Sequence, residues 1–339
     1  MADTTKQITE KQLIAELTNK QYHPVYLLTG EENYYIDLMS NYFENNVIDE
    51  GFRDFDQTVL YGRDVDMPMV LSQAKRFPMM SPVQLVLVKE AQDIAKGWEL
   101  LGTYLENPQP QTILVFCYRY KKLDKRSKAY KMISSKGVIY ERAKLRDYEI
   151  PSWIVSVVQQ KGFTITEKGA MLIAESLGND LPKIANELSK VYISMPEGGV
   201  INEDIIERNI GISKEYNVYE LQNAIGRRDV TSCMKIVNYF AANPKEAPMQ
   251  MVLASLYGYF IKVMLYHQEP DKKMAAAILK VNPYFLRDYE VAARNYSLGK
   301  LASCIGYLFE TDLRSKGVRS SGNVTDGELL KELLFKITH

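Results

Sequence analysis

The sequence predicts an α/β domain with a mainly parallel sheet, followed by helical domains. Up to residue 143, five short apolar runs alternate with helical patterns, as in βαβ units. After Ala143 the strand signal stops, and helical patterns continue to the end. A chain of 339 residues is long enough for two or three domains. We therefore expect an α/β domain at 1–143, a small helical domain at 144–212 and a second helical domain at 213–339.

Continuous apolar runs mark the expected strands of the first domain. The run LVLV at 85–88 is typical of a strand that is covered on both faces of a sheet. Strands are expected at 25–28, 55–60, 85–88, 112–116 and 137–140. Helices are expected between them at about 32–48, 67–77, 95–106 and 125–135.

Proline, glycine and capping residues divide the rest of the chain into helices. Pro151 suits a first helical turn, and Thr166 can cap a helix whose apolar residues follow at helical spacing. The apolar stretch 248–265 is interrupted by polar residues, so we interpret it as a buried core helix, not a membrane span. Further helices are expected at 184–193, 218–225, 230–242, 248–266, 271–279, 284–296, 298–313 and 326–337.

Composition narrows the class of protein. Hydrophobic residues make up 46% and charged residues 25% of the chain, which is ordinary for a soluble globular protein. The 42 basic and 42 acidic residues balance, which argues against a dedicated nucleic-acid binder. Three widely separated cysteines give no metal-ligand spacing and fit a reducing compartment. With no apolar leader at the N-terminus, we expect a cytoplasmic protein without membrane contact.

No motif indicates catalysis, a metal or a cofactor. A nucleotide-binding loop would follow the first strand and needs several glycines and a lysine. Here the loop is LTGEEN, in which Gly30 is followed by Glu31 and Glu32 and no GK[ST] occurs. The three histidines of the chain lie outside any triad or HExxH context. We expect no catalytic residues, no metal site and no cofactor.

A basic segment at 119–131, RYKKLDKRSKAYK, carries seven basic side chains and one acid with tyrosines interleaved. One interpretation is contact with the phosphate backbone of DNA. The other is a solvated helix face, or a surface that forms salt bridges with a partner subunit. The candidate residues are Lys121, Lys122, Lys125, Arg126 and Lys128.

The segment QAKRFPMMSPVQ at 73–84 is the strongest candidate for a binding site. An amphipathic helix ends at Phe77, and Pro78 and Pro82 stiffen the corner before the buried LVLV strand. Met79 and Met80 are adaptable apolar anchors if a partner covers them. Alternatively, these side chains fold under the corner into the core.

Several segments, in order and spacing, resemble the delta subunit family of the bacterial DNA polymerase III clamp loader. They are VYLLTGEENYYID, QAKRFPMMSPVQLVLVKEA, KKLDKRSKAYK, AESLGNDLPKIANELSKV, VYELQNAIGRRDV and ETDLRSKG. The resemblance implies an AAA+-like α/β domain, a small helical lid-like domain and a helical collar domain that joins subunits. It further implies a subunit that opens the sliding clamp during DNA replication without hydrolysing ATP, within a polymerase holoenzyme.

The same resemblance implies partners and a binding site. The partners are the sliding clamp (the beta subunit), ATP-binding clamp-loader subunits, delta-prime and, within the complex, primed DNA. The family's apolar tip falls on Met79 and Met80, with Phe77 beside it. The family tip usually carries at least one phenylalanine, whereas here the phenylalanine comes before Pro78 and both following positions are methionine. The resemblance implies that two of these three residues enter the clamp pocket and leaves open which two.

Two other functions stay open at this point. The chain could be an active AAA+ ATPase subunit, against which the missing GK[ST] argues. It could also be a DNA-binding module that uses the basic segment, and salt-dependent DNA binding by the isolated chain would indicate this.

Overall fold

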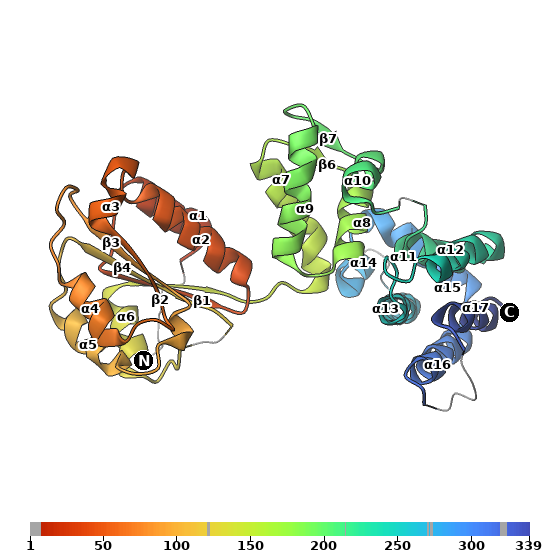
Figure 1. The fold of residues 1–339 in the computed structure, drawn as a ribbon. Helices are drawn as coiled ribbons and strands as arrows, with labels where there is room; N and C mark the ends of the chain where they lie inside the picture. Colours follow the sequence, from red (N-terminus) through yellow and green to blue (C-terminus); the bar gives the residue numbers. More distant parts are fainter. Residues whose placement is uncertain (1–7, 121–122, 214, 270, 272–273, 319–323) are drawn as a thin grey trace. The chain divides into compact units, whose positions relative to one another are not determined.

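The computed structural model describes residues 8–120, 123–213, 215–269, 271, 274–318 and 324–339. Their contacts divide the chain into two compact units, Met1–Leu145 and Arg146–His339. Each unit has a core of its own and is described by itself (Figure 1).

The first unit is built on a five-stranded sheet in which every pairing is parallel, with strand order β2-β3-β4-β1-β5. Strand β1 pairs with β4 on one side and β5 on the other, so that Leu27 lies opposite Phe116 and Ile139. All five predicted strands form. They span Val25–Gly30 (β1), Gln57–Tyr61 (β2), Gln84–Lys89 (β3), Thr112–Tyr118 (β4) and Val138–Arg142 (β5).

Helices cover both faces of this sheet, which explains the continuous apolar runs (Figure 1). On one face lie α1 (Glu10–Thr18) and α2 (Asn33–Asn46), whose Leu13, Ile36 and Phe43 are fully buried. The other face is covered by α4 (Met67–Ala74), α5 (Trp98–Glu106) and α6 (Lys128–Lys136).

Two local features differ from the prediction. Helix α1 begins at a capping box formed by Thr9 and Gln12 and has no counterpart among the predicted helices. The second strand starts at Gln57, because Phe55 and Asp56 belong to α3 (Arg53–Asp56), one helical turn before it. This turn directs the Asp56 side chain toward the loop that follows α4.

The second unit is helical apart from two short strands, Thr164–Ile165 (β6) and Val200–Ile201 (β7), which pair in parallel and were not predicted. Its first four helices are α7 (Ile150–Gln160), α8 (Glu167–Leu177), α9 (Leu181–Ser194) and α10 (Glu203–Ile210). The others are α11 (Val218–Gly226), α12 (Val230–Ala242), α13 (Met249–Gln268), α14 (Ala275–Leu279), α15 (Leu286–Asn295), α16 (Leu298–Ser315) and α17 (Asp326–Thr338).

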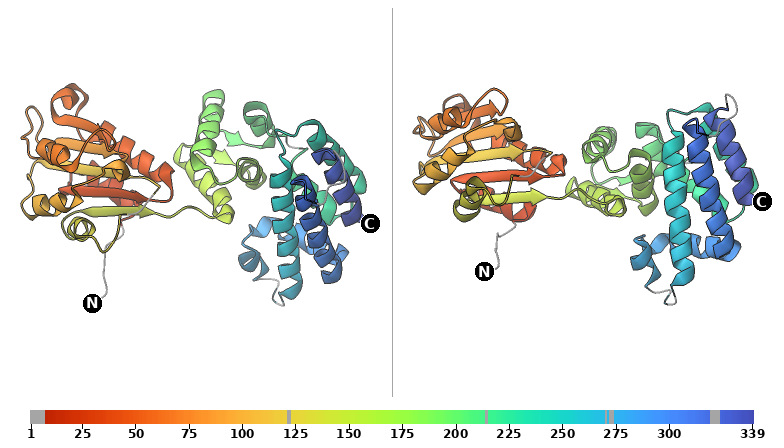
Figure 2. Two further views of the ribbon diagram at one scale, coloured as in Figure 1. Left: turned by 60° about the horizontal axis from the view of Figure 1, so that its bottom comes forward. Right: turned by 90° about the horizontal axis from the view of Figure 1, so that it is seen from below.

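The core of this unit centres on α13, which packs beside α16, while α17 packs against α16 and α12 (Figure 2). By length and composition α13 could cross a membrane, and it is the one such helix among the described residues. Val252, Phe260 and Val263 on α13 are nevertheless fully buried in the core of the unit. This packing agrees with the prediction of a core helix.

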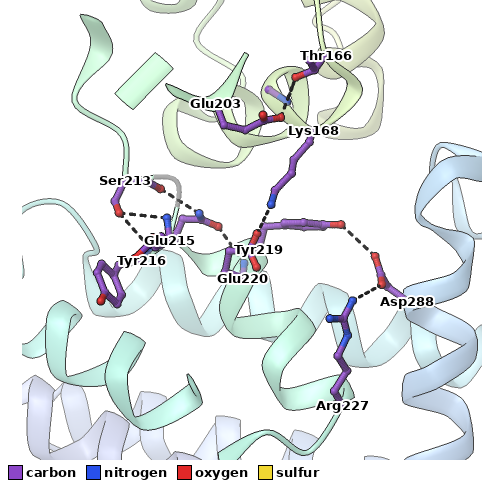
Figure 3. A network of polar contacts seen from close by, with 12 residues as sticks. Thr166, Lys168, Glu203, Ser213, Glu215, Tyr216, Tyr219, Glu220, Arg227 and Asp288 are labelled. Atoms are coloured by element: carbon purple, nitrogen blue, oxygen red, sulfur yellow. Dashed lines mark hydrogen bonds and ion pairs between the residues drawn. The ribbon is translucent and has the colours of Figure 1, made fainter. Parts of the chain in front are cut away.

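Polar contacts join the early and late helices of the second unit (Figure 3). Lys168 on α8 forms an ion pair with Glu220 on α11, with 2.7 Å between Nζ and Oε1. The carboxylate of Asp288 on α15 accepts a hydrogen bond from Tyr219 and forms an ion pair with Arg227. Tyr219 lies on α11, and Arg227 directly follows this helix. The contacts group residues 146–339 together, and a domain boundary at 212/213 stays a prediction.

Candidate functional site

The tip loop, residues 75–83, connects α4 to β3 in the first unit and exposes a cluster of large apolar side chains. Phe77, Met79 and Met80 are 70%, 65% and 57% exposed. Single exposed apolar residues are normal on protein surfaces, but three within four positions of one loop form a local apolar surface. Of the two interpretations of this segment, the structure shows the one in which the side chains do not fold under the corner.

The backbone of the tip loop is held by one buried carboxylate. Asp56 is only 3% exposed, and it accepts hydrogen bonds from the backbone N–H groups of Met79, Met80 and Ser81. The Met80 N–H lies 2.8 Å from Asp56 Oδ2. Burial raises the pKa of the Asp56 carboxyl, but the three backbone donors outweigh it and hold this pKa below its ordinary value.

The start of the tip loop is fixed by a second set of polar contacts. The Gln84 amide donates to the Arg76 carbonyl and, at 2.7 Å, to the Thr112 hydroxyl. The hydroxyl groups of Thr112 and Tyr104 both donate to the Ala74 carbonyl, at 2.8 and 3.2 Å. The Ala74 carbonyl, at the C-terminal end of α4, is therefore satisfied by β4 and by α5.

These contacts hold the backbone of the tip loop in one conformation. The polar groups bind the backbone of the loop from inside, which leaves its apolar side chains pointing to solvent. A fixed loop loses little conformational entropy when a partner binds, so its apolar contacts contribute more fully to affinity.

In the loop after β1 and at the start of α2, backbone N–H groups donate hydrogen bonds to a carbonyl and a carboxylate of the chain itself. Gly30 has φ = 136°, a conformation that favours glycine, and a Cβ at this position would collide with the Arg142 carbonyl. That carbonyl accepts a hydrogen bond from the Glu31 N–H at 2.9 Å. The Glu32 carboxylate caps α2 by accepting from the Tyr34 N–H at 3.3 Å. The donors at the start of α2 thus face a carboxylate of the chain itself.

The basic segment forms ion pairs within the first unit. Lys125 pairs with Glu141 at 3.2 Å, Arg126 with Asp124 at 3.2 Å and Lys128 with Glu106 at 3.8 Å. The side chains of Lys125, Arg126 and Lys128 are still largely exposed. Lys121 and Lys122 lie outside the described residues.

Potential metal ligands and cysteines occur elsewhere in the described part of the chain. No group of three or more potential metal ligands occurs among the described residues. Cys117, Cys233 and Cys304 are free and buried, and burial raises the pKa of the Cys117 thiol to about 11.

Asp56 and Gln84 were not identified from the sequence as site residues. Asp56 was assigned to a strand, in which its side chain would have no reason to meet residues 79–81. One weak sequence signal points to them. Asp56 and Gln84 stand beside apolar runs that are expected to be buried, and a polar side chain in such a place needs a hydrogen-bond partner.

The fold and this site define a protein with a parallel α/β unit that carries an exposed apolar loop, followed by a helical unit. Two family models match, "DNA polymerase III, delta subunit" over residues 26–142 and "DNA polymerase III delta subunit, C-terminal domain" over 215–335. The chain belongs to the family of DNA polymerase III delta subunits, and this membership supports a clamp-loader role.

Two relatives extend the likeness over nearly the whole chain. The DNA polymerase III subunit delta of Bacillus subtilis (strain 168) is 26% identical over 331 residues, which cover 94% of each protein. The solved structure of the Bacillus subtilis DNA clamp loader delta protein superposes with a TM-score of 0.54 at 24% identity, covering 96% of this chain and 98% of that chain. The second likeness supports the fold class predicted above.

Proposed function

We propose that this protein is the clamp-opening subunit of a clamp loader and does not itself hydrolyse ATP. The observation that carries the proposal is the tip loop, where Phe77, Met79 and Met80 are exposed on a backbone held by Asp56. Family membership supports a place in a DNA polymerase III clamp-loader complex. The partners that we propose are the sliding clamp, ATP-binding subunits, delta-prime and primed DNA, in the cytoplasm.

The mechanism is differential binding. A protein shifts a conformational equilibrium only by the difference between its affinities for the two states. The tip would therefore bind a clamp whose ring interface is open more tightly than a closed one. A rigid apolar loop suits this task, because it can fill a pocket of fixed shape and cannot adapt equally to both states.

The decisive experiment uses the purified chain with the sliding clamp of the same organism. We expect direct binding, and release of clamps from nicked circular DNA when the chain is added without nucleotide. Closed rings cannot leave circular DNA, so release reports opening. If the chain neither binds the clamp nor releases it, the proposed function is wrong.

We expect no functional nucleotide site in this chain. The Arg142 carbonyl and the Glu32 carboxylate lie where a phosphate loop would present N–H donors, and two carboxylates repel a triphosphate. Titration with ATP and Mg²⁺ should give neither micromolar binding nor turnover. Turnover by the pure chain that is lost on substitution of Glu31 or Glu32 would favour the ATPase alternative.

Assembly with other loader subunits is expected to use the helices after residue 213. Phe309 on α16 and Phe335 on α17 are 65% and 62% exposed, and the Lys336–Glu310 ion pair joins the two helices. Replacing both phenylalanines with serine should weaken assembly in gel filtration while leaving the Tm nearly unchanged. Tyr284 is exposed and lies outside α16 and α17, so Tyr284→Ser provides the control. Full assembly by the double variant would place the interface elsewhere.

DNA binding by the basic segment is the less favoured alternative. The ion pairs with Glu141, Asp124 and Glu106 compensate the charges of Lys125, Arg126 and Lys128 within the fold. These lysine and arginine side chains remain a proposed contact to DNA or to a neighbouring subunit within the assembled loader.

A further inference from the structure

The carboxylate of Asp56 is buried without a basic partner. Across the described residues no lysine, arginine or histidine forms an ion pair with it, and it accepts hydrogen bonds from the backbone N–H groups of Met79, Met80 and Ser81. A buried charge is costly unless dipoles or charges compensate it. Successive backbone N–H groups that converge on one anion form such a compensating concavity.

The dependence is mutual. Asp56 needs the three N–H groups of the loop to stay charged inside the protein, and the loop needs the carboxylate to hold three successive N–H groups in one direction. Two of the three donors belong to Met79 and Met80, the residues whose side chains are exposed. A change at the carboxylate therefore acts directly on the backbone that carries the docking side chains.

We infer that Asp56 is the positioning residue of the clamp-binding tip: it fixes the Met79–Met80 backbone in the conformation that the clamp recognises and touches no partner itself. This inference rests on the proposed function. Without the carboxylate the loop samples other conformations, and the apparent affinity falls in proportion to the fraction that remains competent to bind.

The neighbouring Asp54 makes a matched control possible. Both aspartates lie on α3, but Asp54 is exposed, whereas Asp56 is buried beneath the loop. Asp56→Asn keeps the shape of the side chain and removes its charge. It also replaces one acceptor oxygen with an NH2 group, a donor that faces a backbone N–H donor and cannot accept its hydrogen bond. Asp54→Asn makes the same chemical change two residues away and leaves the loop untouched.

The experiment compares five full-length proteins by surface plasmon resonance against the organism's clamp: wild type, Asp56→Asn, Asp54→Asn, Met79→Ala with Met80→Ala, and the combination of Asp56→Asn with both alanine substitutions. We expect Asp56→Asn to raise Kd about tenfold and Asp54→Asn to leave it unchanged. Amide hydrogen exchange of Met79, Met80 and Ser81, measured without the clamp, should speed up about tenfold in Asp56→Asn alone. The Tm of each variant shows whether the fold is intact.

A double-mutant cycle separates positioning from a general structural role. If Asp56 acts only through the tip, Asp56→Asn should have no further effect on Kd once Met79 and Met80 are alanine. An equal effect in both backgrounds, or unchanged exchange in the loop, would overturn the inference. If Met79→Ala with Met80→Ala weakens clamp binding while Asp56→Asn does not, the inference alone fails. If the alanine pair binds like wild type, the methionines are not in the site and the inference fails with them. If wild type itself does not bind the clamp, the proposed function fails.

Discussion

Truncating the tip, by Met79→Ala combined with Met80→Ala, should weaken binding to the sliding clamp by roughly 30- to 1000-fold. Central apolar anchors of an interface typically contribute ~2–4 kcal/mol. Both side chains are more than half exposed, so their removal leaves no cavity in the core. The Tm should therefore stay nearly unchanged. Calorimetry with the purified clamp and a thermal melt of the free variant measure the two effects.

The control is Met69→Ala. Met69 lies on α4, outside the tip loop, and is exposed like Met79 and Met80. Losing its side chain should change neither clamp affinity nor Tm. Phe77→Ala then tests which two of the three tip residues enter the clamp. A lowered Tm in the double variant would indicate a core role, and wild-type affinity in a stably folded double variant would remove the methionines from the site.

The second large effect is expected at Glu175, on α8 in the second unit. Its carboxylate oxygen Oε2 is buried without a hydrogen-bond partner. Burial raises the pKa of Glu175 to about 7, although the nearby Lys262 ammonium opposes the shift. Because this pKa is raised above the unfolded value, its contribution to stability is complete below the unfolded pKa. That contribution is lost as the pH rises through about 7.

Glu175→Gln should therefore stabilise the second unit at pH 8 by about 1–3 kcal/mol, with the gain disappearing toward pH 4. The chain has two tryptophans, Trp98 in the first unit and the buried Trp153 on α7 in the second. In a Trp98→Phe background, fluorescence during denaturation follows Trp153 and hence this unit. The exposed Glu197 provides the control Glu197→Gln, for which no pH-dependent gain is expected. If Glu175→Gln stabilised the unit equally at every pH, the gain would not come from the raised pKa of Glu175, and the prediction would be wrong.

Much of the fold could be predicted because its signals are local. The continuous apolar runs of β1, β3 and β4 indicate strands buried on both faces, and helices do cover both faces of this sheet. The change to purely helical patterns after Ala143 falls close to the boundary between the two units at 145/146. The short strands β6 and β7 escaped notice because a two-residue pairing leaves no periodic pattern.

Sequence by itself determined the α/β and helical organisation, the missing phosphate-binding lysine and the order of segments that resembles delta subunits. For the segment around Pro78 it left two interpretations open, and the tertiary structure decided that Phe77, Met79 and Met80 are exposed. Tertiary structure alone also brought Asp56 beneath the tip loop. It placed Arg142 beside Gly30 as well, because β5 pairs with β1 in the sheet. The physical reason is the same for Asp56 and for Arg142. Local secondary-structure propensity follows from neighbouring residues. The partner of a buried carboxylate or carbonyl instead depends on the order of the strands in the sheet, which brings together residues far apart in the chain.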